Sequence, residues 1–265
     1  MRKHSFWRVP LPRVPGRASI YLLPNLLTTV GLFAGFYAIV AAAQGRFPAA
    51  ATAIFVALVT DGLDGRVARM TGTQTEFGAQ YDSLADMTAF GIAPAMVMYD
   101  WMLNDLGRLG WLIAFLYTAG AALRLARFNV QAAPHGRRYF QGLPSPAAAA
   151  FVTATVWLGH SHDFAQPVAV GLAIVVTVAA AASMVSNLRY YSFKEVDLRG
   201  RVPFLALVIV VSGLALISLN PPLVLFAGFA AYAVSGPVVT SRLLRRRFSR
   251  RTEGPDSSGT PPGAA

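Results

Sequence analysis

The stretch DGLDGRVARMTGTQTEFGAQYDSLAD, residues 61–86, places four aspartates in or beside some of the most apolar sequence of the chain. On a helix, Asp61 and Asp64 share one face because they are three residues apart, and Asp82 and Asp86 share one because they are four apart. An ionised carboxylate in apolar surroundings is costly unless it is paired, protonated or bound to a cation, and neighbouring carboxylates also repel one another. The stretch therefore predicts a cation between these side chains.

The ligand chemistry indicates which cation this is. The chain has no cysteine and the stretch has no histidine, so its ligands are carboxylate oxygens, which favour Mg²⁺ or Mn²⁺ over zinc. We interpret the four acids as the ligands of a metal pair that handles phosphate. The alternative is a structural cluster paired with Arg66 and Arg69, but two arginines do not neutralise four acids at such close range. The lack of cysteine also excludes disulfides and thiol nucleophiles.

The composition indicates the fold class. Of the 265 residues, 55% are hydrophobic and only 13% are charged, which is typical of a membrane protein whose core is built from its spans. Eight apolar runs approach the roughly 20 residues that a helix needs to cross a bilayer. We therefore expect an all-α integral membrane protein with about eight transmembrane helices, at residues 20–43, 47–70, 80–102, 109–128, 145–160, 166–186, 203–219 and 221–242.

The net charge of +11 is concentrated in the chain ends and in loops such as 129–144 and 187–202. Basic loops beside apolar spans indicate cytoplasmic loops and anionic lipid head groups rather than nucleic acid. This distribution places both termini in the cytoplasm, with an even number of spans. It divides the chain into a basic arm at 1–19, a membrane domain at 20–243 and a basic, disordered tail at 244–265.

Two further groups of polar residues have open interpretations. Arg124 and Arg127 lie three residues apart near Asn129 at the end of the fourth run. Such arginines either mark topology by reaching the head groups or together hold a phosphate or carboxylate. Asn25 and Thr28 lie one turn apart on the first run, where a capping or helix-packing role is the ordinary expectation.

The pattern Asp61-x2-Asp64-Gly65-x2-Ala68-Arg69-x8-Gly78-x3-Asp82-x3-Asp86 resembles, without departure at its eight positions, the signature of the CDP-alcohol phosphatidyltransferases. The strings DSLADMTAFGIAP, ALRLARFNV, GLPSPAAA and SNLRYYSFKEVD are similar to the phosphatidylserine synthase branch of that family. The resemblance covers about residues 20–200.

The resemblance implies transfer of the phosphatidyl group of CDP-diacylglycerol to the hydroxyl of L-serine, with release of CMP. It implies that Asp61, Asp64 and Asp82 bind divalent metal and that Asp86 is both a ligand and the general base. It also implies a liponucleotide-binding set and an acceptor-binding set. These are Asn25, Thr28, Gly65, Ala68, Arg69 and Gly78 for CDP-diacylglycerol, and Arg124, Arg127 and Asn129 for the acceptor.

The family further implies a homodimer in a bacterial inner membrane, with Gly31 and Gly35 as a local pair that can pack helices. Two other functions stay open. A sister transferase would use glycerol phosphate, inositol phosphate or choline as acceptor. An ion or proton transporter would use the buried acids as a relay.

Overall fold

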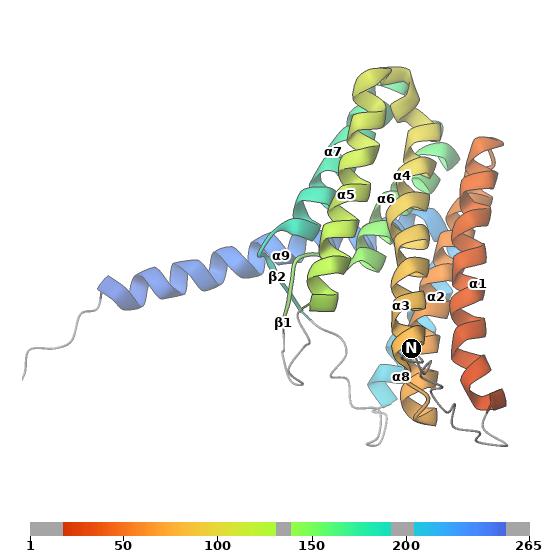
Figure 1. Cartoon of the computed structure of the whole chain (residues 1–265). Helices are drawn as coiled ribbons and strands as arrows, with labels where there is room; N and C mark the ends of the chain where they lie inside the picture. Colours follow the sequence, from red (N-terminus) through yellow and green to blue (C-terminus); the bar gives the residue numbers. More distant parts are fainter. Residues whose placement is uncertain (1–17, 131–138, 192–203, 253–265) are drawn as a thin grey trace, which may run out of the picture.

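The computed structural model describes residues 18–130, 139–191 and 204–252 of the chain, and these residues form a helical bundle with one short β-ribbon (Figure 1). In chain order the elements are α1 (Ala18–Ala43), α2 (Phe47–Thr71), α3 (Glu76–Asp86), η1 (Met87–Ile92), α4 (Ala93–Met98), η2 (Tyr99–Leu103), η3 (Asn104–Leu106), α5 (Arg108–Val130), β1 (Tyr139–Gln141), α6 (Ser145–Ser161), α7 (Gln166–Val185), β2 (Arg189–Tyr191), α8 (Phe204–Leu219) and α9 (Pro221–Thr252).

The prediction of a helical membrane bundle is confirmed, since each of the eight apolar runs falls on a helix or on a continuous helical segment. Among the described residues, five helices are both long and apolar enough to cross a membrane, namely α1, α2, α5, α7 and α9. Helices α6 and α8 are shorter, at 17 and 16 residues, and the third run is divided between several elements. The number of eight crossings therefore stays a prediction.

The third run forms one helical segment from Glu76 to Leu106 whose hydrogen-bonding pattern changes along its length. Two π-helical stretches, η1 and η2, interrupt the α-helical pattern, and η1 begins directly after Asp86. Stretches of π-helix are rare and are often found at functional sites.

In α1 and α2 the buried residues are mostly small and many large apolar residues are exposed. The buried residues of α1 and α2 are largely alanines such as Ala38 and Ala57, whereas Phe33 and Val59 are exposed. This is the arrangement of helices that pack closely by their small residues and present large apolar side chains to lipid. A side chain at Gly35 would collide with the backbone of Ala89 in η1.

The glycine pair of α1 therefore packs within a single chain, because Gly31 faces Thr60 of α2 in the same way that Gly35 faces Ala89. The expectation that this pair supports a dimer is wrong. The predicted homodimer rests on the family resemblance alone.

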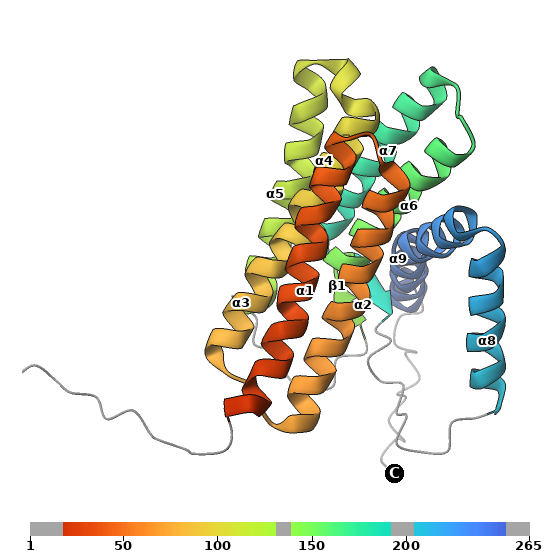
Figure 2. The same cartoon turned by 90° about the vertical axis from the view of Figure 1, so that its right-hand side faces the viewer.

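The β-ribbon was not predicted from the sequence. Strand β1 pairs antiparallel with β2, with Phe140 opposite Tyr190, and so joins the loop before α6 to the loop after α7. The ribbon lies near the end of α5 and beside α9, on the side of the molecule toward which α1 and α3 begin (Figures 1 and 2). The basic residues expected in the loops at 131–138 and 192–203, like the arm up to residue 17, lie outside the described residues.

The two C-terminal helices depart from the parallel bundle. Helix α8 stands apart from α1 and α2 and packs mainly on α9, which runs across the direction of the other long helices (Figures 1 and 2). Helix α9 continues to Thr252 and so reaches into the tail at 244–265 for which disorder is expected. Its basic residues are good helix formers, and they extend the helix where no proline or glycine ends it. Residues 253–265 lie outside the described part of the chain.

Candidate active site

The turn between α2 and α3 brings the two pairs of acids opposite each other. Gly72 ends α2 in a left-handed conformation (φ 63°), and its N–H donates to the carbonyl of Ala68. Thr75 caps α3, because its side-chain hydroxyl accepts a hydrogen bond of 2.9 Å from the backbone N–H of Gly78. The chain thus reverses within a few residues, and α1 packs against both α2 and α3, so that the acids of the two helices face each other.

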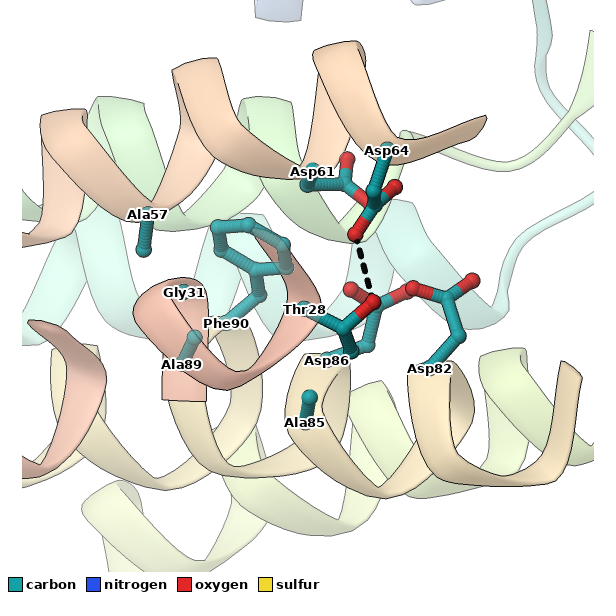
Figure 3. Close-up of a pocket in the computed structure, with 10 residues that line it drawn as sticks. All are labelled: Thr28, Gly31, Ala57, Asp61, Asp64, Asp82, Ala85, Asp86, Ala89 and Phe90. Atoms are coloured by element: carbon teal, nitrogen blue, oxygen red, sulfur yellow. Dashed lines mark hydrogen bonds between the residues drawn. The ribbon is translucent and has the colours of Figure 1, made fainter. Parts of the chain in front are cut away.

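All four predicted acids meet in one hollow between these helices (Figure 3). Asp61, Asp64 and Asp82 each offer a carboxylate oxygen, and these oxygens lie within 4.8 Å of one another. Asp86 lines the same hollow one turn further along α3. The space is about 200 Å³ when the open region outside its mouth is included, so only small ions or waters fit between the acids.

Helix α1 closes one side of the hollow through Thr28. Its buried hydroxyl donates a hydrogen bond of 2.9 Å to Oδ2 of Asp64, the most deeply buried of the acids. A neighbour that holds a carboxylate in this way fixes the orientation of a metal ligand. Asn25, one turn earlier, places its side-chain oxygen beside Gly78. The sequence predicted both residues for the liponucleotide, and the structure brings Thr28 to the acid cluster and Asn25 to the start of α3.

The donor set fits a divalent metal. None of the ten described residues that line the hollow is Lys or Arg, so Arg66 and Arg69 do not lie between the acids. Converging carboxylates of this kind are stabilised by a cation between them or by protonation. Hard carboxylate oxygens at this spacing suit Mg²⁺ or Mn²⁺, and Asp61, Asp64 and Asp82 are the residues that would hold it.

The remaining motif residues lie along the last turns of α2 and the start of α3. The guanidinium of Arg69 lies over Gly65, where an added Cβ would be 3.7 Å from Nη1. Ala68 supplies the carbonyl that accepts the N–H groups of both Gly72 and Thr73. A Cβ at Gly78 would press on Thr75 at 3.0 Å, so this glycine serves the local fold as well as any ligand.

The three residues predicted for the acceptor have separate partners. Arg124 Nη1 donates to the hydroxyl of Ser145 at 3.1 Å, and the guanidinium lies within electrostatic range of Asp86. The side-chain amide of Asn129 donates a hydrogen bond of 3.1 Å to the hydroxyl of Ser83 in α3. None of the three lines the acid hollow, and Arg124 is the one whose guanidinium interacts electrostatically with Asp86.

Arg127 instead binds the ribbon end of the bundle. Its Nη2 donates to Gln141 Oε1 at 2.7 Å and to Asn187 Oδ1 at 2.9 Å. The structure does not bring the two guanidinium groups to one anion, because Arg124 is bound to α6 and Arg127 to the ribbon region.

Sequence reasoning missed Ser145 and Tyr232, which are polar neighbours of Arg124 from α6 and α9. Ser145 stands between two prolines at the start of α6, and this pattern indicates a residue whose backbone position is fixed. Tyr232 lies in an apolar helix more than a hundred residues from Arg124, and no spacing rule links the two.

Comparison with known proteins identifies the class. The sequence pattern of the CDP-alcohol phosphatidyltransferase family matches residues 21–235, and the chain belongs to this family.

The chain is similar to several proteins named for one reaction. It is 36% identical over 217 residues to the CDP-diacylglycerol–serine O-phosphatidyltransferase of Helicobacter pylori, covering 82% of this chain and 90% of that protein. It is 39% identical over 146 residues to the protein of the same name from Mycobacterium leprae, covering 53% and 48%. It is also 32% identical over 174 residues to an archaetidylserine synthase of Methanothermobacter thermautotrophicus, covering 65% and 70%.

Proposed function

We propose that this chain transfers the phosphatidyl group of CDP-diacylglycerol to the hydroxyl of L-serine and releases CMP. The observation that carries this proposal is the convergence of Asp61, Asp64, Asp82 and Asp86 on one hollow in a member of this family. Similarity to relatives named for transfer to serine supports the choice of acceptor.

The metal site of the proposal consists of Asp61, Asp64 and Asp82, with Asp86 beside it. When bound, divalent ions, Mg²⁺ or Mn²⁺ and two in number, would neutralise the diphosphate and stabilise the charge of the leaving CMP. Thr28 contributes by holding Asp64 in one orientation.

Asp86 is the proposed general base. It accepts the proton of the serine hydroxyl as the serine oxygen forms a bond to the phosphorus that carries the diacylglycerol. The bond from that phosphorus to the bridging oxygen of the diphosphate breaks, and both electrons leave with CMP. No covalent enzyme intermediate is required.

The liponucleotide is proposed to lie against the mouth of the hollow. A molecule of this size exceeds the space between the acids, so its nucleotide rests on the surrounding residues and its acyl chains stay in lipid. The proposed contacts are Asn25, Thr28, Gly65, Ala68, Arg69 and Gly78.

For the acceptor we propose Arg124 as the direct contact, because its guanidinium interacts electrostatically with Asp86. Arg127 and Asn129 hold the elements around it, through the ribbon and through α3 respectively.

The cellular setting follows from the distribution of charge. The protein is an integral membrane protein, and we propose that the end carrying the hollow and the ribbon faces the cytoplasm of a bacterial cell, at the inner membrane. In this arrangement both termini are cytoplasmic, 1–19 is a basic arm, 20–243 is the transferase domain and the protein forms a homodimer. CMP then leaves directly into water.

The test is incorporation of radiolabelled L-serine into chloroform-soluble lipid by the purified protein, supplied with CDP-diacylglycerol and Mn²⁺ or Mg²⁺. We expect labelled phosphatidylserine, an equal amount of CMP, and loss of both with EDTA. Release of CMP only with glycerol phosphate, inositol phosphate or choline would replace serine as the acceptor. Ion flux in liposomes without lipid chemistry would instead support a transporter.

A further inference from the structure

Helix α1 touches both of the helices that carry the acids. It packs along α2 and also against α3, whereas α2 and α3 have few direct contacts with each other among the described residues. Figure 3 shows Thr28 of α1 between the helix that carries Asp64 and the helix that carries Asp86. The placement of the two acid-bearing helices relative to each other therefore depends on α1.

Two adjacent threonines of α1 each bind one of these helices. The Thr28 hydroxyl donates to Oδ2 of Asp64 in α2, as described above. Thr29 Oγ1 lies 2.9 Å from the hydroxyl of Tyr81 in α3. The Thr29 hydroxyl donates at 2.7 Å to the carbonyl of Asn25, one turn earlier, so the Tyr81 hydroxyl is the donor of the bond between the helices. Neighbouring residues of a helix point about 100° apart, and this lets the two threonines reach two different helices.

The bond to Tyr81 is made directly beside a metal ligand. Tyr81 precedes Asp82 in α3, and the rotation of a helix about its axis sets the direction of both side chains. The Tyr81 ring is also stacked on the ring of Phe77, one turn earlier, with the centroids 6.0 Å apart. This stacking restricts the positions open to the phenol. A hydrogen bond at Tyr81 thus constrains the rotation of α3, on which the direction of Asp82 depends.

We propose that the hydrogen bond between Thr29 and Tyr81 is a positioning contact of the metal site, which keeps Asp82 of α3 aligned with Asp64 of α2. This inference rests on the proposed function. Thr28 orients one ligand directly, and Thr29 orients the helix that carries another. The ligand oxygens lie within 4.8 Å of one another in this arrangement. Because Mg²⁺ demands near-ideal octahedral geometry, a small rotation of α3 weakens the binding of such an ion.

The first experiment measures binding of the metal alone to the full-length protein in detergent. Free Mn²⁺ is followed by electron paramagnetic resonance without either substrate, so the result does not depend on turnover. Tyr81→Phe keeps the stacked ring and removes only the hydroxyl. We expect its Kd for Mn²⁺ to rise about five-fold, the factor that corresponds to one neutral hydrogen bond. Thr29→Val should give a similar rise, whereas Thr29→Ser keeps the hydroxyl and should bind Mn²⁺ as the wild type does.

The matched controls are a tyrosine and a threonine at other places on α1 and α2. In Tyr37→Phe the ring that packs under the guanidinium of Arg46 is kept. In Thr52→Val the lost hydroxyl donates at 2.8 Å to the carbonyl of Pro48 in its own helix. Both variants should keep the Kd of the wild type. The Tm of each metal-free protein is measured alongside, because a merely structural contact would lower the Tm and leave the Kd unchanged.

The second experiment asks whether the two hydroxyls act as one contact. The double variant Thr29→Val/Tyr81→Phe should bind Mn²⁺ about as weakly as either single variant, because all three lack the same hydrogen bond. A Kd that rises by the product of the two single factors would overturn the proposal. An unchanged Kd in Tyr81→Phe would overturn it as well, whether or not the Tm falls.

Steady-state kinetics give an independent readout. In Tyr81→Phe the Mn²⁺ concentration for half-maximal rate should rise by the same factor as the Kd, while the KM for L-serine stays unchanged. A higher KM for CDP-diacylglycerol with an unchanged Kd for Mn²⁺ would overturn the proposal and place Tyr81 at the liponucleotide. Wild-type protein that binds no Mn²⁺ and makes no phosphatidylserine would overturn the proposed function itself. A wild type that binds Mn²⁺ no better than Tyr81→Phe would overturn this inference alone.

Discussion

The acid hollow and the acceptor side of the site are built in different ways. The four carboxylates come from 26 consecutive residues and from two helices joined by a tight turn. The proposed acceptor side is assembled from α3, α5 and α6, through Asp86, Arg124 and Ser145. The first region is set by local spacing and the second by packing between distant helices. Substitutions in the two regions should therefore fail in different ways.

The largest effect is expected at the point where the two regions meet. Asp86→Asn removes the proposed base and should lower serine transfer roughly a hundred- to ten-thousand-fold, because general-base catalysis contributes about that much. Transfer is measured with radiolabelled serine, and folding by size-exclusion chromatography. A variant that keeps a tenth of the wild-type rate would show that Asp86 is not the base.

A smaller effect is expected within the acid hollow. Thr28→Val keeps the shape of the side chain but removes the hydrogen bond to Asp64, and partners of metal ligands typically contribute about 10- to 100-fold in affinity or activity. We expect the Mn²⁺ concentration for half-maximal rate to rise by such a factor while the serine KM stays unchanged. A change in the serine KM alone would assign Thr28 to the acceptor side instead.

Substitutions at Gly35 and Gly65 should distinguish an effect on helix packing from an effect on ligand binding. At Gly35 a Cβ would lie 2.7 Å from Ala89 Cα, so Gly35→Ala should lower the free energy of unfolding by about 1–3 kcal/mol. At Gly65 the nearest side-chain atom is 3.7 Å away, so Gly65→Ala should leave the Tm unchanged and raise the KM for CDP-diacylglycerol several-fold. Thermal unfolding and steady-state kinetics of both variants decide this. A lower Tm in Gly65→Ala would make that glycine structural.

The smallest effect is expected for Arg127, which serves the acceptor side indirectly. Arg127→Ala loses two hydrogen bonds at a partly exposed position, and we expect a loss of about 1 kcal/mol in the free energy of unfolding. The serine KM should change less than it does in Arg124→Ala. If the serine KM rises as much as in Arg124→Ala, Arg127 contacts the acceptor.

The same contrast explains what could be predicted from the sequence. Asp61 and Asp64, like Asp82 and Asp86, are spaced for one helical face, and a short polar turn with Gly72 makes the two helices neighbours, so the acid cluster was predictable. The partners of Arg124 and Arg127 were not, because they depend on how α5 packs against α6, the ribbon and α9. The three-residue strands of the ribbon are too short to produce a recognisable alternation of polar and apolar residues.

The π-helical stretch η1 has a consequence for how the chain tolerates changes in length. A π-helical turn takes up an additional residue, and in an α-helix each residue advances the rotation by about 100°. One residue more or fewer between Met87 and Ile92 would thus turn Asp82 and Asp86 relative to everything that follows them, with every carboxylate still present. Insertions and deletions in this segment are therefore far more disruptive to the site than most substitutions. The number of residues between the acids and α4 therefore sets how Asp82 and Asp86 face the rest of the bundle.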